Sequence, residues 1–265
     1  MSAGARTRLL LAACVLGVSI GASAQGPPGA PPGPPRPPRA AAPVDLTGTW
    51  VSVISEDWRW RMVTPLKGDA ASVPLRPEGF AVVNAWDPAK DEAAGLQCKA
   101  YGAPAILRLP TRVRISWQDD ATLKLETDTG TQTRLFRFGA EAPPKTAPSW
   151  QGHSVAQWER PPQLPGPVNS IPIFATRTGT RGRSLEVTTT NLRAGYLRKN
   201  GVPYSEKTTV TEYFDYHKEP NGDEWFTVTT VVRDPQYLNG PFITSSDFKK
   251  EPDGSRWNPT PCSAR

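Results

Sequence analysis

The sequence predicts an all-β fold: an antiparallel barrel of about eight to ten strands, with one or two short helices inserted near residues 77–95. Two observations predict it. Apolar and polar residues alternate with a period of two over several short segments, and turn-forming residues separate these segments. No repeat of fixed period runs through the chain, which argues against propellers and solenoids.

Three consecutive strands give the clearest signal. They span residues 112–117, 122–127 and 131–138, with turns at 118–121 and 128–130. Because no helix connects them, a parallel strand–helix–strand fold is excluded for this region, and an up-and-down sheet is expected. Residues 139–182 are irregular apart from one predicted strand. The remaining strands are predicted at 154–159, 185–191, 207–214, 224–233 and 242–248.

The first strand is expected to cover residues 51–60, and it is unusually aromatic. On a strand, Trp58 and Trp60 share one face, and the charged residues Asp57, Arg59 and Arg61 share the other. We expect Trp58 to face the interior. In the opposite arrangement, the charged residues form a polar patch on one wall of a cavity.

Residues 77–95 break the alternation. Pro77-Glu78 is a typical helix start, and Phe80 and Val83 fall at helical spacing before Asp87-Pro88 interrupts the pattern. We expect one or two short helices that lie across a barrel mouth or side.

A short motif stands at the start of the β-patterned body. Gly48-Thr49-Trp50 resembles the Gly-x-Trp signature of the lipocalins and their calycin relatives. The resemblance implies an exported bacterial lipocalin-like barrel, in which the first strand curls across the base and Trp50 fills the closed end as a structural residue. It also implies a cavity, because a barrel of about eight strands can enclose one small ligand.

Three segments are expected along the chain. Residues 1–24 have the features of a signal peptide: Arg6 and Arg8, an apolar stretch, and Ala22-Ser23-Ala24 as the cleavage site. Residues 25–43 are rich in Gly and Pro and are expected to be a disordered linker, and residues 44–265 are expected to form a single barrel domain.

The leader predicts a periplasmic or secreted protein, and a lipid anchor at Cys14 is the alternative, because Leu11-Ala12-Ala13-Cys14 resembles a lipobox. No segment is apolar over the roughly 20 residues that a transmembrane helix needs, although association with the cell envelope is left open. Cys98 and Cys262 are expected to form a disulfide in an oxidising compartment, and two free buried thiols are the alternative.

The charge pattern and the absence of known motifs argue against several classes of function. The chain has 31 Lys and Arg against 25 Asp and Glu, but the basic residues are scattered, and no nucleic-acid-binding motif is found. The Gly-x-Ser-x-Gly, His-Glu-x-x-His, P-loop and dinucleotide motifs are absent, so no cofactor is expected. Two histidines at unrelated positions do not suggest a metal site.

Two groups of polar residues are candidates for a site. His153 follows Gly152 in a loop, which suits a base or a ligand-contacting donor, and a hydrogen bond to the backbone is the alternative. Glu212 is a candidate inward carboxylate that pairs with Arg134 or Arg193 across the barrel.

Two further sets of residues belong to turns or to the closed end. The polar and aromatic stretch 188–206 predicts a hairpin that carries Tyr196 and Tyr204. The resemblance to lipocalin-like barrels, many of which stack an arginine near the Gly-x-Trp indole, implies an arginine beside Trp50, and Arg233 is another candidate for it. His217 is expected at a solvated hairpin tip.

Three functions are compatible with these patterns. The leading hypothesis is binding of a small hydrophobic or aromatic molecule by Trp58, Trp60, Arg134, Arg193, Tyr196 and Tyr204. The second is a cofactor-independent enzyme (an isomerase, hydratase, lyase or cyclase) with His153, Asp57 and Glu212 as catalytic residues. The third is a structural envelope protein with a packed interior and no ligand.

Overall fold

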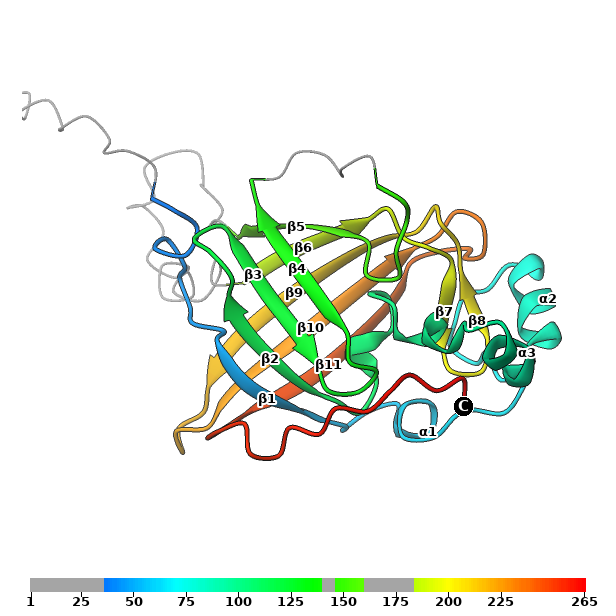
Figure 1. Cartoon of the computed structure of the whole chain (residues 1–265), viewed down its shortest axis with the longest axis horizontal. Helices are drawn as coiled ribbons and strands as arrows, with labels where there is room; N and C mark the ends of the chain where they lie inside the picture. Colours follow the sequence, from blue (N-terminus) through cyan, green and yellow to red (C-terminus); the bar gives the residue numbers. More distant parts are fainter. Residues whose placement is uncertain (1–35, 140–145, 160–183) are drawn as a thin grey trace, which may run out of the picture. The chain divides into compact units, whose positions relative to one another are not determined.

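Within the described residues, nine strands form one closed barrel in the order β1-β11-β10-β9-β6-β5-β4-β3-β2 (Figure 1). The computed structural model describes residues 36–139, 146–159 and 184–265. The expected signal peptide and most of the expected linker therefore lie outside the described residues. The barrel strands are β1 (Gly48–Val53), β2 (Arg112–Trp117), β3 (Thr122–Thr127), β4 (Thr133–Phe138), β5 (His153–Trp158), β6 (Leu185–Thr190), β9 (Thr209–Lys218), β10 (Glu224–Arg233) and β11 (Phe242–Glu251).

The pairing is antiparallel throughout the barrel except between β4 and β5, which run parallel with Phe136 opposite Ser154. The barrel closes because β1 pairs with both β2 and β11. The predicted all-β fold, the number of strands and the three-stranded meander over β2, β3 and β4 are thus confirmed. The parallel pair departs from the expected up-and-down order, since consecutive strands of an up-and-down barrel run antiparallel.

Smaller elements gather at one end of the barrel, and we call them the cap (Figure 1). The helices predicted over 77–95 are present, and Asp87 caps the second one by accepting a hydrogen bond from the Ala89 amide. The cap consists of α1 (Trp58–Arg61), α2 (Pro77–Ala85), α3 (Pro88–Ala93), the 3₁₀ segments η1 (Gln97–Tyr101) and η2 (Ile106–Arg108), and the hairpin β7 (Gly195–Arg198) with β8 (Val202–Tyr204).

Close packing joins α2 to the hairpin. Gly201 has a φ of 83°, and a side chain there would come within 2.4 Å of the Trp86 ring, so this turn requires glycine. Apolar residues of the cap, including Val83 and Val202, form a second core cluster with Val210, Val232 and Phe242 of the barrel strands. The cap is therefore held onto the barrel end by apolar burial.

The barrel interior farther from the cap is filled by aromatic rings. Trp50, Phe136, Phe214, Phe226 and Phe248 are all 0% exposed, and we call them the aromatic core. Phe226 lies at its centre, with ring centroids 4.9 Å from Trp50, 4.8 Å from Phe248 and 5.8 Å from Phe214. Side chains without exposed area border no space large enough for water, so this part of the barrel is a packed core.

Trp50 lies inside the barrel, as the Gly-x-Trp motif predicted. Its indole N–H donates to the carbonyl of Leu46, 2.9 Å away, and the Lys250 ammonium lies 5.3 Å from its ring centroid. The cation beside this indole is therefore Lys250, and Arg233, one of the candidates, is exposed on the outside of β10. Near the same end of the barrel, the Trp158 indole N–H donates to Pro38, in the part of the expected linker that the structure describes.

The expected strand over residues 51–60 is wrong beyond Val53. Asp57 adopts a left-handed conformation with a φ of 54°, and residues 58–61 form one helical turn instead of continuing β1. The helical turn directs Arg61 into the protein, where its side chain makes three hydrogen bonds. These buried contacts outweigh the strand preference of the aromatic residues, because an unpaired strand end gains no ladder hydrogen bonds.

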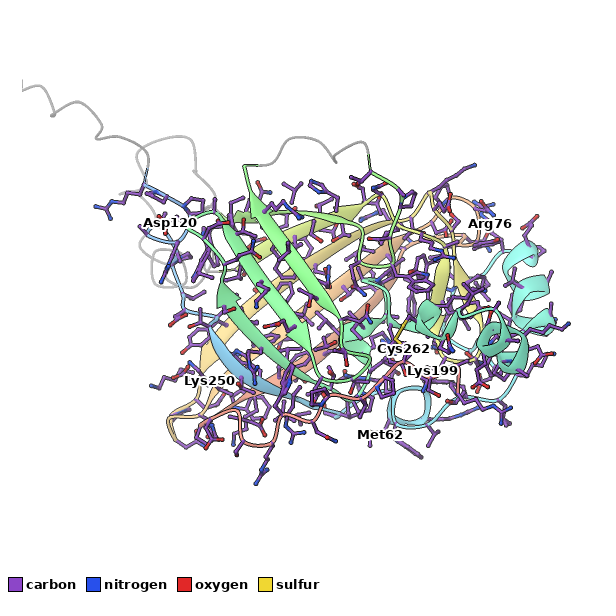
Figure 2. The ribbon with its side chains drawn as sticks, in the orientation of Figure 1. Met62, Arg76, Asp120, Lys199, Lys250 and Cys262 are labelled. Atoms are coloured by element: carbon purple, nitrogen blue, oxygen red, sulfur yellow. A yellow bond between two sulfur atoms is a disulfide. The ribbon has the colours of Figure 1, made fainter. Side chains whose placement is uncertain are left out.

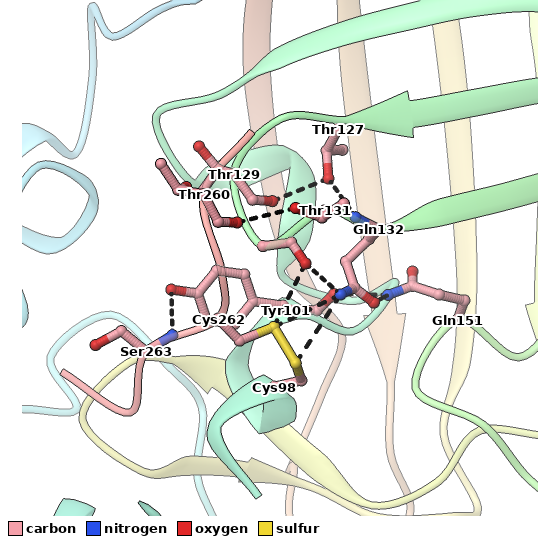
Figure 3. Close-up of a disulfide and its surroundings, with 11 residues drawn as sticks. Cys98, Tyr101, Thr127, Thr129, Thr131, Gln132, Gln151, Thr260, Cys262 and Ser263 are labelled. Atoms are coloured by element: carbon pink, nitrogen blue, oxygen red, sulfur yellow. Dashed lines mark hydrogen bonds between the residues drawn. A yellow bond between two sulfur atoms is a disulfide. The ribbon is translucent and has the colours of Figure 1, made fainter. Parts of the chain in front are cut away.

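Cys98 and Cys262 form the predicted disulfide, which joins η1 to the C-terminal segment (Figure 3). Around it, the side-chain amide of Gln132 donates to the carbonyl of Gly130, and the backbone amide of Ser263 donates to the Tyr101 hydroxyl. The bond closes a loop with a sequence separation of 164 residues. In the described residues, no helix is both long and apolar enough to span a membrane.

Candidate functional site

Three buried arginines meet where the cap covers the barrel. Arg61 comes from α1, Arg108 from η2 and Arg198 from β7, and they are 3%, 5% and 3% exposed. We call them the arginine cluster. Arginine is seldom buried this deeply without a charged partner, so the partners of each guanidinium decide what the cluster can do.

Arg61 has a complete set of protein partners. Its Nε donates to the carbonyl of Arg108 at 2.8 Å, its Nη1 to Glu56 Oε1 at 2.7 Å and its Nη2 to Ser246 Oγ at 3.1 Å. Ser246 belongs to β11, so Arg61 ties α1 to the barrel wall. Each of the three nitrogens of the Arg61 guanidinium thus has a hydrogen-bond partner within the protein, so the burial of Arg61 needs no ligand.

Arg108 pairs with the carboxylate of Asp57, Nη2 to Oδ2, at 3.0 Å. Its guanidinium also lies 5.5 Å from the ring centroid of Phe242 on β11. The side chain of Asp57 is 35% exposed and that of Glu56 is 40% exposed. The two carboxylates therefore form the side of the cluster that water reaches.

Arg198 is the exception in the cluster. Its Nη1 donates to the carbonyl of Ala71 at 2.8 Å, but its Nε and Nη2 are buried without a hydrogen-bond partner among the described residues. None of the described carboxylates forms an ion pair with it. The guanidinium lies between the rings of Trp60, at 4.8 Å, and Phe242, at 5.9 Å.

The electrostatics follow from this arrangement. Burial, and then the neighbouring guanidinium of Arg108, lower the pKa of Arg198 to about 10. The same two causes, in the same order, lower the pKa of Arg61. Carboxylates act in the opposite direction: Asp57 and Asp69 raise the pKa of Arg198, and Glu56, Asp57 and Asp247 raise that of Arg61.

A separate ion pair lies inside the barrel. Arg134 on β4 and Glu212 on β9 face each other across the interior, with Nη1–Oε1 at 2.9 Å and Nη2–Oε2 at 2.5 Å. Arg134 also donates to Thr189 Oγ1, which shares a hydrogen bond with Ser154. Of the two partners expected for Glu212, the structure selects Arg134. Arg193 is exposed on the cap, 4.7 Å from the ring centroid of Trp150.

Two of the residues predicted for ligand binding or catalysis lie at the arginine cluster. Trp60 stacks on Arg198 and donates its indole N–H to Asp69, and Asp57 pairs with Arg108. Trp58, which we expected to face the interior, is 67% exposed. The reason is again the helical turn, which points neighbouring aromatic residues in different directions.

The two predicted tyrosines lie elsewhere in the cap. The Tyr196 hydroxyl donates to Asp91 at 2.9 Å and accepts from Lys99, and burial together with the Asp91 hydrogen bond raises its pKa. Tyr204 is fully buried, burial raises its pKa, and its hydroxyl has no hydrogen-bond partner among the described residues. Neither tyrosine contacts the arginine cluster through a hydrogen bond of the described residues.

His153 lies on the outward face of β5, because side chains alternate along a strand and the adjacent Ser154 points inward. It is nonetheless 6% exposed, and burial, followed by the charge of Arg137, lowers its pKa. The structure therefore does not place His153 with Glu212 and Asp57 around one cavity. His217 is exposed near the β9–β10 turn, 3.7 Å from Glu219.

Sequence reasoning missed Arg108 and Arg198 as site residues. Both stand next to leucines that are buried in the structure, Leu107 and Leu109 beside Arg108 and Leu197 beside Arg198. For Arg108, its place inside the apolar run 106–109 is a signal that could have identified it, since an arginine between buried neighbours needs a reason to be there. Arg198 is followed by Lys199 and gives no such signal.

The chain was also compared with known proteins. No protein-family model matches the chain, and neither a curated protein nor a solved structure matches it.

Proposed function

We propose that this protein binds a small molecule that carries an anionic group, a carboxylate or a phosphate, on an apolar or aromatic body, and that the arginine cluster is the binding site. The observation that carries this proposal is Arg198, a buried cation with two unpartnered nitrogen donors. An unpaired buried charge costs several kcal/mol, and an anion bound beside it offsets that cost. Guanidinium donors also match carboxylate and phosphate oxygens in geometry.

The aromatic core supports this location over the centre of the barrel. Its five rings fill the interior away from the cap, so a ligand there would have to displace packed side chains. We propose that the likeness to lipocalins covers the closed barrel and the indole seal at Trp50, while the ligand binds under the cap. Asp57 and Glu56 are partly exposed, so we propose that an anion enters from their side. It competes with their carboxylates for the guanidinium groups.

The Cys98–Cys262 disulfide supports a periplasmic or secreted location, because structural disulfides persist in oxidising compartments. We therefore propose that this protein is exported and binds its ligand in the periplasm or outside the cell.

Titration calorimetry with three probes tests the binding proposal: benzoate, phenyl phosphate and the neutral analogue benzyl alcohol. We expect the two anions to bind and the alcohol not to bind. In Arg198→Met, anion affinity should fall by roughly 30-fold or more, because losing a buried charge partner costs about 2 kcal/mol or more. Arg193→Met, which removes an exposed arginine stacked on Trp150, is the matched control and should bind as the wild type does.

Stability of the unliganded variants separates the proposal from a purely structural cluster. Replacing an unpaired buried cation with methionine should leave the unfolding free energy within about 1 kcal/mol of the wild type or raise it. If no anionic probe binds the wild type, or if Arg198→Met destabilises the protein by about 3 kcal/mol or more, as removal of a paired buried charge does, the cluster is structural and the proposal fails.

A further inference from the structure

An exposed apolar surface borders the arginine cluster. Of the six large apolar side chains that are exposed in the described residues, four lie within one short segment: Trp58 at 67%, Met62 at 53%, Val63 at 61% and Leu66 at 80%. The exposed cationic residues Arg59 and Lys67 lie among them. We call these four apolar residues, together with Arg59 and Lys67, the α1 surface.

The backbone under the α1 surface is firmly held. The Asn200 side-chain amide donates to the carbonyls of Leu66 and Asp69, both at 2.8 Å, and Arg198 donates to that of Ala71. Arg61, within the same segment, is anchored to Glu56, Arg108 and Ser246. The apolar side chains are therefore presented to the outside by a fixed scaffold, which distinguishes them from side chains on an untethered loop.

The charges at the α1 surface are not all of one sign. Lys67 forms no ion pair among the described residues, whereas Arg59 is paired with Asp69 at 2.7 Å. Glu56 and Asp57, which precede Trp58, have side chains that are 40% and 35% exposed. Met62 and Val63 also line a half-open pocket of about 290 Å³ together with Lys199 and Arg265, and none of its ten lining residues is acidic. Figure 2 labels Met62 and Lys199 on the same side of the cap.

We propose that the α1 surface is a peripheral membrane-contact site that binds an anionic lipid bilayer. Trp, Met, Val and Leu side chains insert at the boundary between headgroups and acyl chains, and flanking Lys and Arg bind anionic headgroups. A stable protein interface involves roughly 20–30 residues on each side, more than this surface offers, so the bilayer is the better match. The arginine cluster then lies next to the membrane surface.

Co-sedimentation of the full chain with two kinds of vesicle tests this inference: pure phosphatidylcholine, and phosphatidylcholine mixed in equal parts with phosphatidylglycerol. We expect binding to the anionic vesicles and weak binding to the neutral ones. Leu66→Glu should reduce partitioning at least tenfold, because it removes an inserting apolar group and adds a repelled charge. Lys67→Gln should reduce it roughly fivefold, which is the contribution of one lysine near an anionic surface.

Ile243→Glu is the matched control, because Ile243 is also apolar and 59% exposed but belongs to β11, outside the α1 surface. It should bind vesicles as the wild type does, and circular dichroism verifies that each variant is folded. Equal binding of wild type and Leu66→Glu, or no preference for anionic vesicles, overturns the inference. A wild-type dimer in light scattering that Leu66→Glu converts to a monomer also overturns it, because the α1 surface would then join two copies of the chain.

Discussion

Two buried arginines of this protein meet the cost of burial in different ways. Arg134 donates two hydrogen bonds to Glu212 and a third to Thr189 Oγ1, and its Nε is buried without a partner among the described residues. Arg198 has aromatic rings and one carbonyl in place of a carboxylate. A paired charge of this kind is expected to serve the fold, whereas an unpaired one is expected to serve a ligand.

The Arg134–Glu212 pair gives a prediction at the scale of single residues. Glu212→Gln should lower the unfolding free energy by about 3–5 kcal/mol, because it leaves the Arg134 charge buried and unpaired. The double variant Arg134→Met, Glu212→Leu should recover most of this loss, since it removes both charges. Urea unfolding followed by circular dichroism measures the three free energies.

The partly exposed pair of Lys124 and Glu126, 3.0 Å apart on β3 with side chains 32% and 29% exposed, is the control for this prediction. Removing Glu126 there should change the unfolding free energy by about 1 kcal/mol or less. If Glu212→Gln costs no more than the Glu126 variant, the barrel interior is wet enough to solvate Arg134, and the packed description of that layer is wrong.

At this scale the sequence predicts what local pattern determines and misses what the fold assembles. Trp50 was placed inside by a short motif, and Glu212 was paired with Arg134 as one of two alternatives because both stand on strands. Arg198 could not be singled out, because its two neighbours Trp60 and Phe242 lie far from it in the sequence. The arginine cluster is defined by contacts between residues that are far apart in the sequence, and such contacts leave no periodic pattern in it.

Among the elements, the strands with regular alternation were the most predictable. The meander over β2, β3 and β4 follows directly from alternation and turn residues. The segment after Val53 was not predictable in the same way, because a run of alternating charge and indole suits a strand and a helical turn equally. Burial of Arg61, together with the left-handed Asp57, decides in favour of the turn. The α1 surface and the positions of Arg61 and Trp60 at the candidate site depend on that single turn.

The disulfide gives a prediction at the scale of elements. Beyond β11, the C-terminal segment contains no strand of the barrel, and Cys262 ties it to η1. Replacing both cysteines with serine should lower the unfolding free energy by about 2–5 kcal/mol. Hydrogen exchange should show faster exchange in the C-terminal segment and in η1, with the barrel strands unchanged.

The wild type in the presence of dithiothreitol is the control for this variant and should behave in the same way. If the double serine variant is as stable as the oxidised wild type, the contacts of Gln132 and Tyr101 hold the tail without the covalent bond.

For the molecule as a whole, the interior of the closed barrel has two parts with different chemistry. The aromatic core fills one part, and polar pairs and the arginine cluster occupy the part beneath the cap. Alternation predicts which side of a strand faces inward, but it does not predict how far the inward side chains fill the space. The sequence therefore predicted a barrel with a cavity, whereas the size of its side chains leaves the aromatic core packed.

Phe226 gives the prediction that tests this packed interior, because its ring contacts those of Trp50, Phe214 and Phe248. Phe226→Ala should lower the unfolding free energy by about 3–5 kcal/mol and open an apolar cavity. Such cavities stay dry and bind benzene, so benzene should raise the melting temperature of the variant and leave that of the wild type unchanged. Phe80→Ala, at a side chain that is 43% exposed on α2, is the control and should show no benzene effect. A wild type that benzene stabilises as strongly as it stabilises the variant would mean that the barrel is hollow at its aromatic end, and a ligand site there would then compete with the one beneath the cap.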